Sequence, residues 1–186
     1  MAHVVAELSV GDTEVPASLK DAAKKTRPPE GRSFALSLLK HPGDPVLDVG
    51  TGDCACVASI LASHGTRVVA LDKDHETVLT ARMFLNAQRL KKAVRLLQDD
   101  ITASGLTSSS FRNIVCFNVL HHVSRFDSAL AELRRILASD GRLIISEFDE
   151  NRDGFLERLK QAVSCQFHSV TAYRRPGGRL VLVCEK

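Results

Sequence analysis

The stretch PVLDVGTGDCA, residues 45–55, decides the fold. Its first half, 45–49, is a short apolar and β-branched run of the kind that forms a buried strand. A helical pattern over 54–64 follows it. Between the two stands Gly50-x-Gly52-x-x-Ala55, in which glycines permit a tight turn and let the backbone approach a ligand closely. The pattern predicts a strand, a cofactor loop and a helix.

Downstream, short β-branched runs alternate with helical stretches, which is typical of a parallel sheet with crossover helices. Further strands are expected at 67–71, 94–97, 113–117, 142–146, 166–172 and 179–184, and helices near 79–90, 126–137 and 155–163. The last two strands are joined by Pro176-Gly177-Gly178, which is too short for a parallel crossover. We therefore predict a doubly wound, mostly parallel seven-stranded α/β sheet with one antiparallel strand in a C-terminal hairpin.

Apolar spacing predicts which helix faces pack on the sheet. In the 79–90 helix, one face is expected to carry Leu79, Met83, Ala87 and Leu90. In the 126–137 helix, the residues expected to face the sheet are Leu130, Leu133 and Leu137. Asp127 or Ser128 should cap this helix, and a turn at Asp140-Gly141 should lead into the next strand.

The first 44 residues are less regular than the rest. Helical patterns are expected at 18–25 and 33–40, with a breaker at 27–29 between them. Residues 1–44 are predicted to be an N-terminal helical arm, either a lid over the site or a helix that packs on the domain. The cofactor-binding domain is then predicted to span 45–186.

The composition limits the class of protein. A chain of 186 residues fits one domain, and no apolar run approaches the roughly 18 to 20 residues needed to cross a bilayer. The first residues lack the cationic start of a secretion signal. Five scattered cysteines indicate free thiols in a reducing compartment. We expect a cytoplasmic protein without membrane contact; the sequence carries no signal for its oligomeric state.

The glycine loop alone fits two cofactors. Asp72 closes the second strand about 20 residues after Gly50, where a carboxylate would hold a ribose diol. NAD(P)-dependent oxidoreductases share this pattern. Asp48 and Asp53, however, would weaken a diphosphate site at the helix N-terminus, whereas they would attract the ammonium and sulfonium of S-adenosylmethionine. The charges favour the sulfonium cofactor, with the oxidoreductase as the alternative.

Five successive blocks resemble the signature blocks of class I S-adenosylmethionine-dependent methyltransferases in order and interval. They read VLDVGTGDC, VVALDKD, LLQDDI, FRNIVCFNVLHHV and ALAELRRILASDGRLIISEF. The N-x-L-H-H sequence after the fourth strand is similar to that of a large group acting on small molecules. The resemblance covers roughly residues 44–150. It implies a Rossmann-like fold, S-adenosyl-L-methionine as methyl donor and S-adenosyl-L-homocysteine as product.

The same resemblance implies roles for residues at the strand ends. Asp48 would help to hold the methionine ammonium, directly or through water, beside the backbone of the loop residues Gly50, Thr51 and Gly52. Asp72 would bind the ribose hydroxyls and Lys73 would flank the adenine. Each acidic residue could instead cap a turn, but their joint placement at the carboxyl ends of adjacent strands favours a ligand site.

The third and fourth strands supply the remaining residues that the resemblance implies. Asp100, followed by Ile101, would read the adenine amino group, with its neighbour Asp99 as the alternative. Asn118 would line the methionine end. Cys54 departs from the family, which often has a third glycine at this position, and the helix N-terminus there would lower the pKa of its thiol.

Methyl transfer to a hydroxyl needs a general base, whereas a neutral sulfur or amine needs little more than alignment. The candidate catalytic residues are His121, His122 and Glu147, at the edge of the sheet where the donor would bind. No Cys and His grouping has the spacing of a zinc site, so no metal is expected.

The sequence indicates the chemical class of the methyl acceptor only in outline. The fourth-strand block lacks the N-P-P-[YF] pattern of enzymes that methylate base or glutamine amino groups, and the basic pairs are scattered with few aromatic residues between them. A small-molecule acceptor is expected, with nucleic acid and protein substrates left open. A binding protein that keeps the cofactor pocket without catalysis is the third hypothesis.

Overall fold

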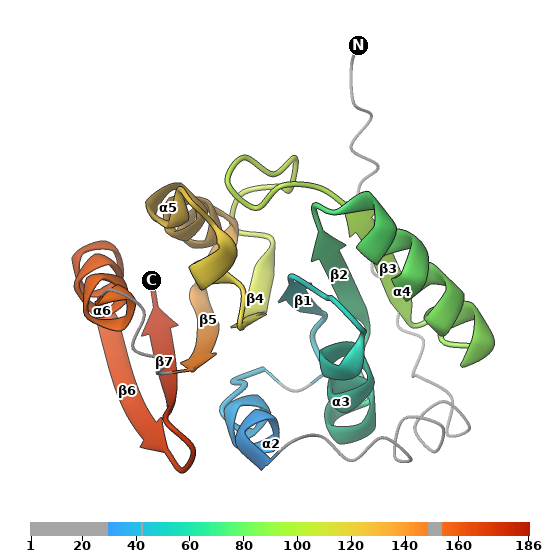
Figure 1. The fold of residues 1–186 in the computed structure, drawn as a ribbon, viewed down its shortest axis with the longest axis horizontal. Coiled ribbons are helices and arrows are strands. Elements are labelled where there is room, and N and C mark those ends of the chain that lie inside the picture. Colours follow the sequence, from blue (N-terminus) through green and yellow to red (C-terminus); the bar gives the residue numbers. More distant parts are fainter. Residues whose placement is uncertain (1–29, 42, 149–153) are drawn as a thin grey trace.

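One sheet of seven strands, in the order β3-β2-β1-β4-β5-β7-β6, forms the centre of the computed structural model, which describes residues 30–41, 43–148 and 154–186 (Figure 1). The strands are β1 (Val46–Val49), β2 (Val68–Asp72), β3 (Val94–Gln98), β4 (Phe111–Phe117), β5 (Leu137–Phe148), β6 (Ser169–Arg175) and β7 (Arg179–Glu185). Only β7 is antiparallel to its neighbours, β5 and β6. The predicted sheet and its C-terminal hairpin are confirmed.

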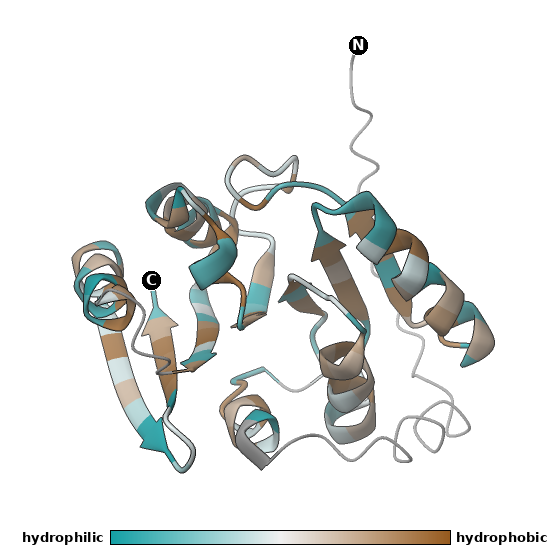
Figure 2. Cartoon of the chain, in the orientation of Figure 1, coloured by the Kyte–Doolittle hydropathy of each residue, from teal (hydrophilic) through white to brown (hydrophobic). Residues whose placement is uncertain are grey.

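Helices cover both faces of this sheet. They are α2 (Glu30–Ser37), α3 (Ala55–His64), α4 (His75–Ala87), the short 3-10 helix η1 (Leu120–His122), α5 (Phe126–Ile136) and α6 (Phe155–Gln166). One apolar cluster joins the sheet to α5 and α6, and a second joins it to α2, α3 and α4. Figure 2 shows the central strands as apolar and the outer sides of the helices as more polar. Among the described residues, no helix is long and apolar enough to cross a membrane.

Side chains along β1 alternate between the two faces, as a strand requires. Leu47 and Val49 belong to the cluster under α5 and α6, while Val46 belongs to the cluster under α2 and α3. Asp48 therefore points to the α2 and α3 side, together with Val46. This placement sets the surroundings of the carboxylate at the candidate site.

The packing face predicted for α4 is wrong. Met83 is 73% exposed and Leu79 is also exposed, whereas the helix buries Val78, Ala81 and Leu85. Both sets recur at helical spacing, so the apolar pattern alone does not choose between them. Leu90 is buried as expected, but it lies beyond the end of the helix.

The junction of α5 and β5 also differs in detail from the prediction. Arg125 occupies the N-cap of α5 without a side-chain cap bond, so neither Asp127 nor Ser128 caps this helix. The turn expected at Asp140-Gly141 lies inside a long β5, where the pairing with β4 shifts register between Phe111 and Asn113. The three leucines predicted to face the sheet are fully buried.

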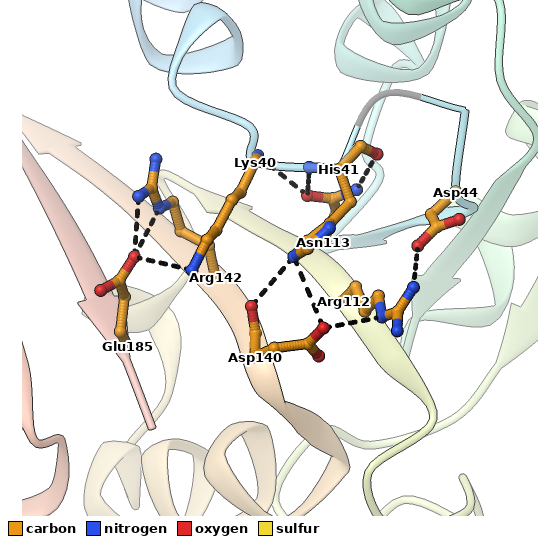
Figure 3. Close-up of polar contacts among 8 residues, drawn as sticks. All are labelled: Lys40, His41, Asp44, Arg112, Asn113, Asp140, Arg142 and Glu185. Atoms are coloured by element: carbon orange, nitrogen blue, oxygen red, sulfur yellow. Dashed lines mark hydrogen bonds and ion pairs between the residues drawn. The ribbon is translucent and has the colours of Figure 1, made fainter.

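Hydrogen bonds fix the segment between α2 and β1 across the amino ends of β4 and β5 (Figure 3). Asn113 on β4 is buried, and its Oδ1 accepts from the backbone N–H groups of Lys40 and His41 at 3.3 and 3.4 Å. Its Nδ2 donates to the His41 carbonyl at 2.7 Å. Because both amides bond to Asn113, they cannot continue a helix, and α2 ends at Ser37 rather than at the predicted residue 40.

The described part of the N-terminal arm packs into the core. Ala35 and Leu36 are buried in the cluster that α2 shares with α3. The helix predicted at 18–25 and the breaker at 27–29 lie outside the described residues, so the domain boundary at residue 44 and the lid role stay predictions.

Replacing Asn113 by alanine should lower the free energy of unfolding by about 1 to 3 kcal/mol, because buried backbone groups lose their partner. Arg112→Ala on the same strand is the matched control. Arg112 is half exposed, with ion pairs to Asp44 and Asp140 at the surface, so its loss should lower the free energy of unfolding clearly less than the loss of Asn113. Urea unfolding measures both values, and equal losses in the two variants would contradict the role given to Asn113.

Candidate active site

A cavity of about 250 Å³ lies at the carboxyl ends of β1, β2, β3 and β4. Eight residues that the sequence predicted to bind a cofactor line it: Gly50, Gly52, Asp72, Lys73, Asp99, Asp100, Ile101 and Asn118. The remaining lining residues are Val49, Leu71, Thr77, Val119, His122 and Val123. Open α/β sheets bind ligands at this edge.

Backbone hydrogen bonds hold the loop after β1 against the end of β2. The N–H groups of Gly50 and Thr51 both donate to the Leu71 carbonyl, at 2.8 and 3.2 Å. The Gly52 N–H donates to Asp72 Oδ2 at 3.3 Å, and the Ala55 N–H donates to Asp53 Oδ1 at 3.0 Å. These amides are occupied by protein oxygens, whereas a diphosphate site would direct such amides at the ligand. The loop is therefore poorly suited to a dinucleotide.

Three positions in this loop, Gly50, Gly52 and Cys54, adopt left-handed backbone conformations. Gly50 has φ +71°, and a Cβ there would lie 2.3 Å from Val119 Cγ2 in the loop after β4. Cys54 has φ +62° and is fully buried. Burial raises the pKa of its thiol to about 11, so the lowered pKa expected at a helix N-terminus is wrong.

Asp48 lies beneath the loop rather than on the cavity wall. It is 1% exposed, and its Oδ2 atom is buried without a hydrogen-bond partner. Burial raises the pKa of Asp48 to about 6, an effect that the side chains of Cys56 and Thr51 and the charge of Arg32 partly offset. Thr51, another predicted cofactor residue, is also buried and does not line the cavity.

The two acidic residues that follow β3 differ in how many of their carboxylate oxygens already accept a hydrogen bond. Asp99 accepts from the Asp100 N–H with Oδ1 and from the Gly105 N–H with Oδ2, at 2.8 and 3.0 Å. Asp100 is exposed and accepts from the Thr102 N–H with Oδ1, and this bond lowers the pKa of Asp100. Asp100 therefore has the freer carboxylate oxygen, which favours it over Asp99 as the reader of a ligand amino group.

Asn118 stands where β4 turns toward η1. It has φ +56°, a conformation that asparagine adopts more readily than most residues. Its N–H donates to the Ser146 carbonyl at 2.8 Å, and its Oδ1 accepts from Arg179 Nη1 at 3.4 Å. Asn118 thus connects the cavity wall to the carboxyl end of β5 and the start of β7.

The buried carboxylate of Glu147 organises the turn that carries the two histidines. Its Oε1 accepts from the N–H groups of Val119 and Leu120, at 3.1 and 2.9 Å. Its Oε2 lies 2.7 Å from His121 Nδ1. Because a carboxylate only accepts hydrogen bonds, Nδ1 carries the proton of this bond, and Nε2 is the ring nitrogen that does not contact Glu147. His121 and Glu147 do not line the cavity, but His122 does, with its ring centroid 3.9 Å from that of His121.

The lining residues that the sequence did not single out are mostly apolar neighbours of those it did. Val49, Leu71, Val119 and Val123 flank predicted polar residues along the chain. A search for apolar side chains at the strand ends could have found them. Among the described residues, no group of three or more His, Cys, Asp or Glu side chains could hold a metal ion.

Gly50→Ala should destabilise the fold, because its Cβ would collide with Val119 and its φ is positive. Gly52→Ala is the matched control. It shares the positive φ, but the nearest atom to a Cβ there is the Gly50 carbonyl oxygen at 4.0 Å. Thermal unfolding should therefore show a clearly lower Tm for Gly50→Ala than for Gly52→Ala. Equal Tm values would show that the contact with Val119 does not constrain the loop.

Comparisons with known proteins give one matching family model and several similar proteins. A methyltransferase domain model matches residues 47–145. An uncharacterized 37.1 kDa protein in transposon TN4556 of Streptomyces fradiae is 32% identical over 157 residues, which are 80% of this chain and 44% of that protein. The ubiquinone/menaquinone biosynthesis C-methyltransferase UbiE of Teredinibacter turnerae is 30% identical over 120 residues, 63% of this chain and 48% of its own. The chain thus spans under half the length of these two relatives.

A solved structure shows the same fold. It is a SAM-dependent methyltransferase from Aquifex aeolicus, with a TM-score of 0.61 at 22% identity, covering 89% of this chain and 97% of that one. The family model covers more than half of the residues and ends in β5, so it includes every strand that borders the cavity. The chain belongs to the class I S-adenosylmethionine-dependent methyltransferases.

Proposed function

We propose that this chain transfers a methyl group from S-adenosylmethionine to an O, N, S or C nucleophile of a small molecule. The observation that carries the proposal is the cavity itself, in which residues from four separate strand ends meet as the family's cofactor residues would. The loop amides add support, because they are bonded within the protein and leave no cradle for the diphosphate of NAD(P).

The residues present fit the sulfonium cofactor. The unpartnered and buried Oδ2 of Asp48 is an acceptor that a nearby cationic group would satisfy. Asp72 would hold the ribose hydroxyls, Asp100 and Ile101 the adenine, and Asn118 with the Gly50 backbone the methionine end. Lys73 would flank the adenine, and the buried Thr51 would stabilise the conformation of the loop after β1.

When bound, the cofactor supplies an electrophilic methyl group, and the acceptor displaces it from sulfur. The protein aligns the acceptor and, for a hydroxyl or carbon acid, removes a proton. His121 is the proposed general base, through Nε2, and Glu147 is its positioning residue, since it fixes the ring through Nδ1. His122 lies on the cavity wall, with its ring next to that of His121.

A small-molecule acceptor is supported by the similarity to UbiE, which is named for C-methylation in ubiquinone and menaquinone biosynthesis. The His121 and Glu147 pair agrees with an acceptor that must lose a proton. We place the reaction in the cytoplasm, because all five cysteines are free thiols, as a reducing compartment keeps them.

Ligand binding and labelled transfer test this function. S-adenosylmethionine and S-adenosylhomocysteine should raise the Tm of the protein, and NAD(H) should not. Radiolabelled methyl should then pass from S-adenosylmethionine to a small molecule in a metabolite extract. Stabilisation by NAD(H) alone would favour the oxidoreductase, and binding without any transfer would favour a non-catalytic cofactor-binding protein.

The raised pKa of Asp48 predicts how the affinity for S-adenosylmethionine depends on pH. Since burial raises its pKa to about 6, the empty native state holds the proton more tightly than the unfolded chain, and stability falls as pH rises from about 4 to 6. A cationic ligand favours the ionised form, so S-adenosylmethionine affinity should rise over pH 5 to 7. Asp48→Asn should abolish that rise, bind roughly tenfold more weakly at pH 7.5 and unfold at a higher Tm without ligand.

Calorimetry at several pH values, with thermal unfolding of the empty protein, measures these effects. Asp140→Asn is the control, because Asp140 is exposed near the amino ends of β4 and β5 and does not line the cavity. An affinity for S-adenosylmethionine that does not change with pH in the unmodified protein would refute the role given to Asp48.

His121→Asn should lower kcat by about 10²- to 10⁴-fold, the usual contribution of a general base, without changing the Kd of S-adenosylhomocysteine. Glu147→Gln keeps an acceptor for the two backbone amides but disturbs the ring, so it should lower kcat less and shift the pH profile of kcat. His168→Asn, on the exposed edge before β6, is the control. If His122→Asn lowers kcat more than His121→Asn, the base is His122 instead.

A further inference from the structure

Two arginines lie beside the cavity at the carboxyl edge of the sheet, on the side covered by α2. Arg179 begins β7, and its Nη1 donates to Ser146 Oγ at 2.7 Å and to Asn118 Oδ1 at 3.4 Å. Its guanidinium also lies 3.8 Å from the ring centre of Phe148. Since Asn118 lines the cavity and Arg179 does not, Arg179 stands just outside the cofactor cavity.

Arg32 reaches the same region from α2. It is half-buried, and its Nη1 atom is buried without a hydrogen-bond partner. Phe34, two residues further along α2, lies 5.4 Å from the ring of Tyr173 and 4.2 Å from the guanidinium of Arg175 on β6, and Arg175 pairs with Arg179. The charge of Arg32 also lowers the pKa of Asp48 and, after burial, that of Arg179. Within the ranges that the structure describes, no carboxylate forms an ion pair with Arg32 or Arg179.

Two neighbouring guanidinium groups that are partly desolvated repel each other, and an unpartnered buried donor adds a further cost. An anion placed between them removes both penalties, because guanidinium groups bind carboxylates and phosphates through strong charge-assisted hydrogen bonds. Asp48 cannot serve as that anion: it lies under the loop, and its own Oδ2 is also unpartnered.

We propose that Arg32 and Arg179 together bind an acidic group, a carboxylate or a phosphate, of the methyl acceptor. Arg179 stands outside the cofactor cavity beside Phe148, which favours an anion of the molecule next to the cofactor over one of the cofactor itself. Phe148, 42% exposed under the Arg179 guanidinium, offers an apolar surface next to this charge. The inference rests on the proposed function and narrows the acceptor to small acids with an apolar part.

Binding of simple probes tests this site. With the protein saturated in S-adenosylhomocysteine, benzoate or phenyl phosphate should bind at least about tenfold more tightly than the neutral benzamide, as expected for charge-assisted hydrogen bonds. Arg179→Met and Arg32→Met should remove the preference, while Arg32→Lys should keep part of it because the charge remains. Lys92→Met, an exposed cation between α4 and β3, should change nothing.

The outcomes distinguish a site for the acceptor from a site for the donor's own carboxylate. Equal binding of acid and amide to the unmodified protein, or a preference that survives both methionine variants, would overturn the proposal. So would an Arg32→Met variant that binds S-adenosylhomocysteine more weakly but keeps its acid preference and its affinity for 5′-methylthioadenosine, because Arg32 would then hold the carboxylate of the donor. Failure of S-adenosylhomocysteine to bind at all would count against the proposed function. Titration of the acids into the protein without S-adenosylhomocysteine would then still test whether Arg32 and Arg179 bind an acidic group.

Discussion

The packing of Val119 against Gly50 is the contact on which the cavity depends. It brings the loop after β4 so close to the loop after β1 that only a residue without a side chain fits at position 50. With Val119 held there, Asn118 must turn through a left-handed conformation, and the chain enters η1 at once. The amides of Val119 and Leu120 then point to Glu147. One steric contact thus constrains both the loop after β1 and the turn that carries the histidines.

Asp48 departs from the rule that buried polar atoms have hydrogen-bond partners, and it does so at the candidate site. A carboxylate that is 1% exposed and leaves one oxygen unpartnered is costly in a folded protein. Buried polar atoms without a partner are found mainly at functional sites, where a bound ligand can supply the missing hydrogen bond. The nearby Arg32 offsets part of the cost without forming an ion pair, so the carboxylate stays responsive to a cation that arrives from above the loop.

Sequence patterns predicted the sheet, its order of elements and most of the cavity wall, because the glycine loop and the strand ends are local signals at fixed spacing. They failed where the choice depends on tertiary packing. On α4, the stripe with Leu79 and Met83 and the stripe with Val78 and Leu85 have the same period, and only contact with the sheet selects the second. The bond between His121 and Glu147 depends on the register of β4 against β5, which no spacing reveals. Arg32 and Arg179 lie in segments without a readable motif.

The end of β5 explains how one strand can serve two different tasks. Ser146 and Glu147 are consecutive, so their side chains point to opposite faces of the sheet. Glu147 faces η1 and orients His121, while Ser146 faces the α2 side and accepts from Arg179. The proposed base and the proposed anion site are therefore connected to adjacent residues of one strand. The strand is paired on both sides, by β4 and β7, which restrains the positions of these two residues. In this arrangement, the acidic group of an acceptor would be bound on the face of the sheet that carries Ser146, and the proposed base would approach the acceptor from the face that carries Glu147.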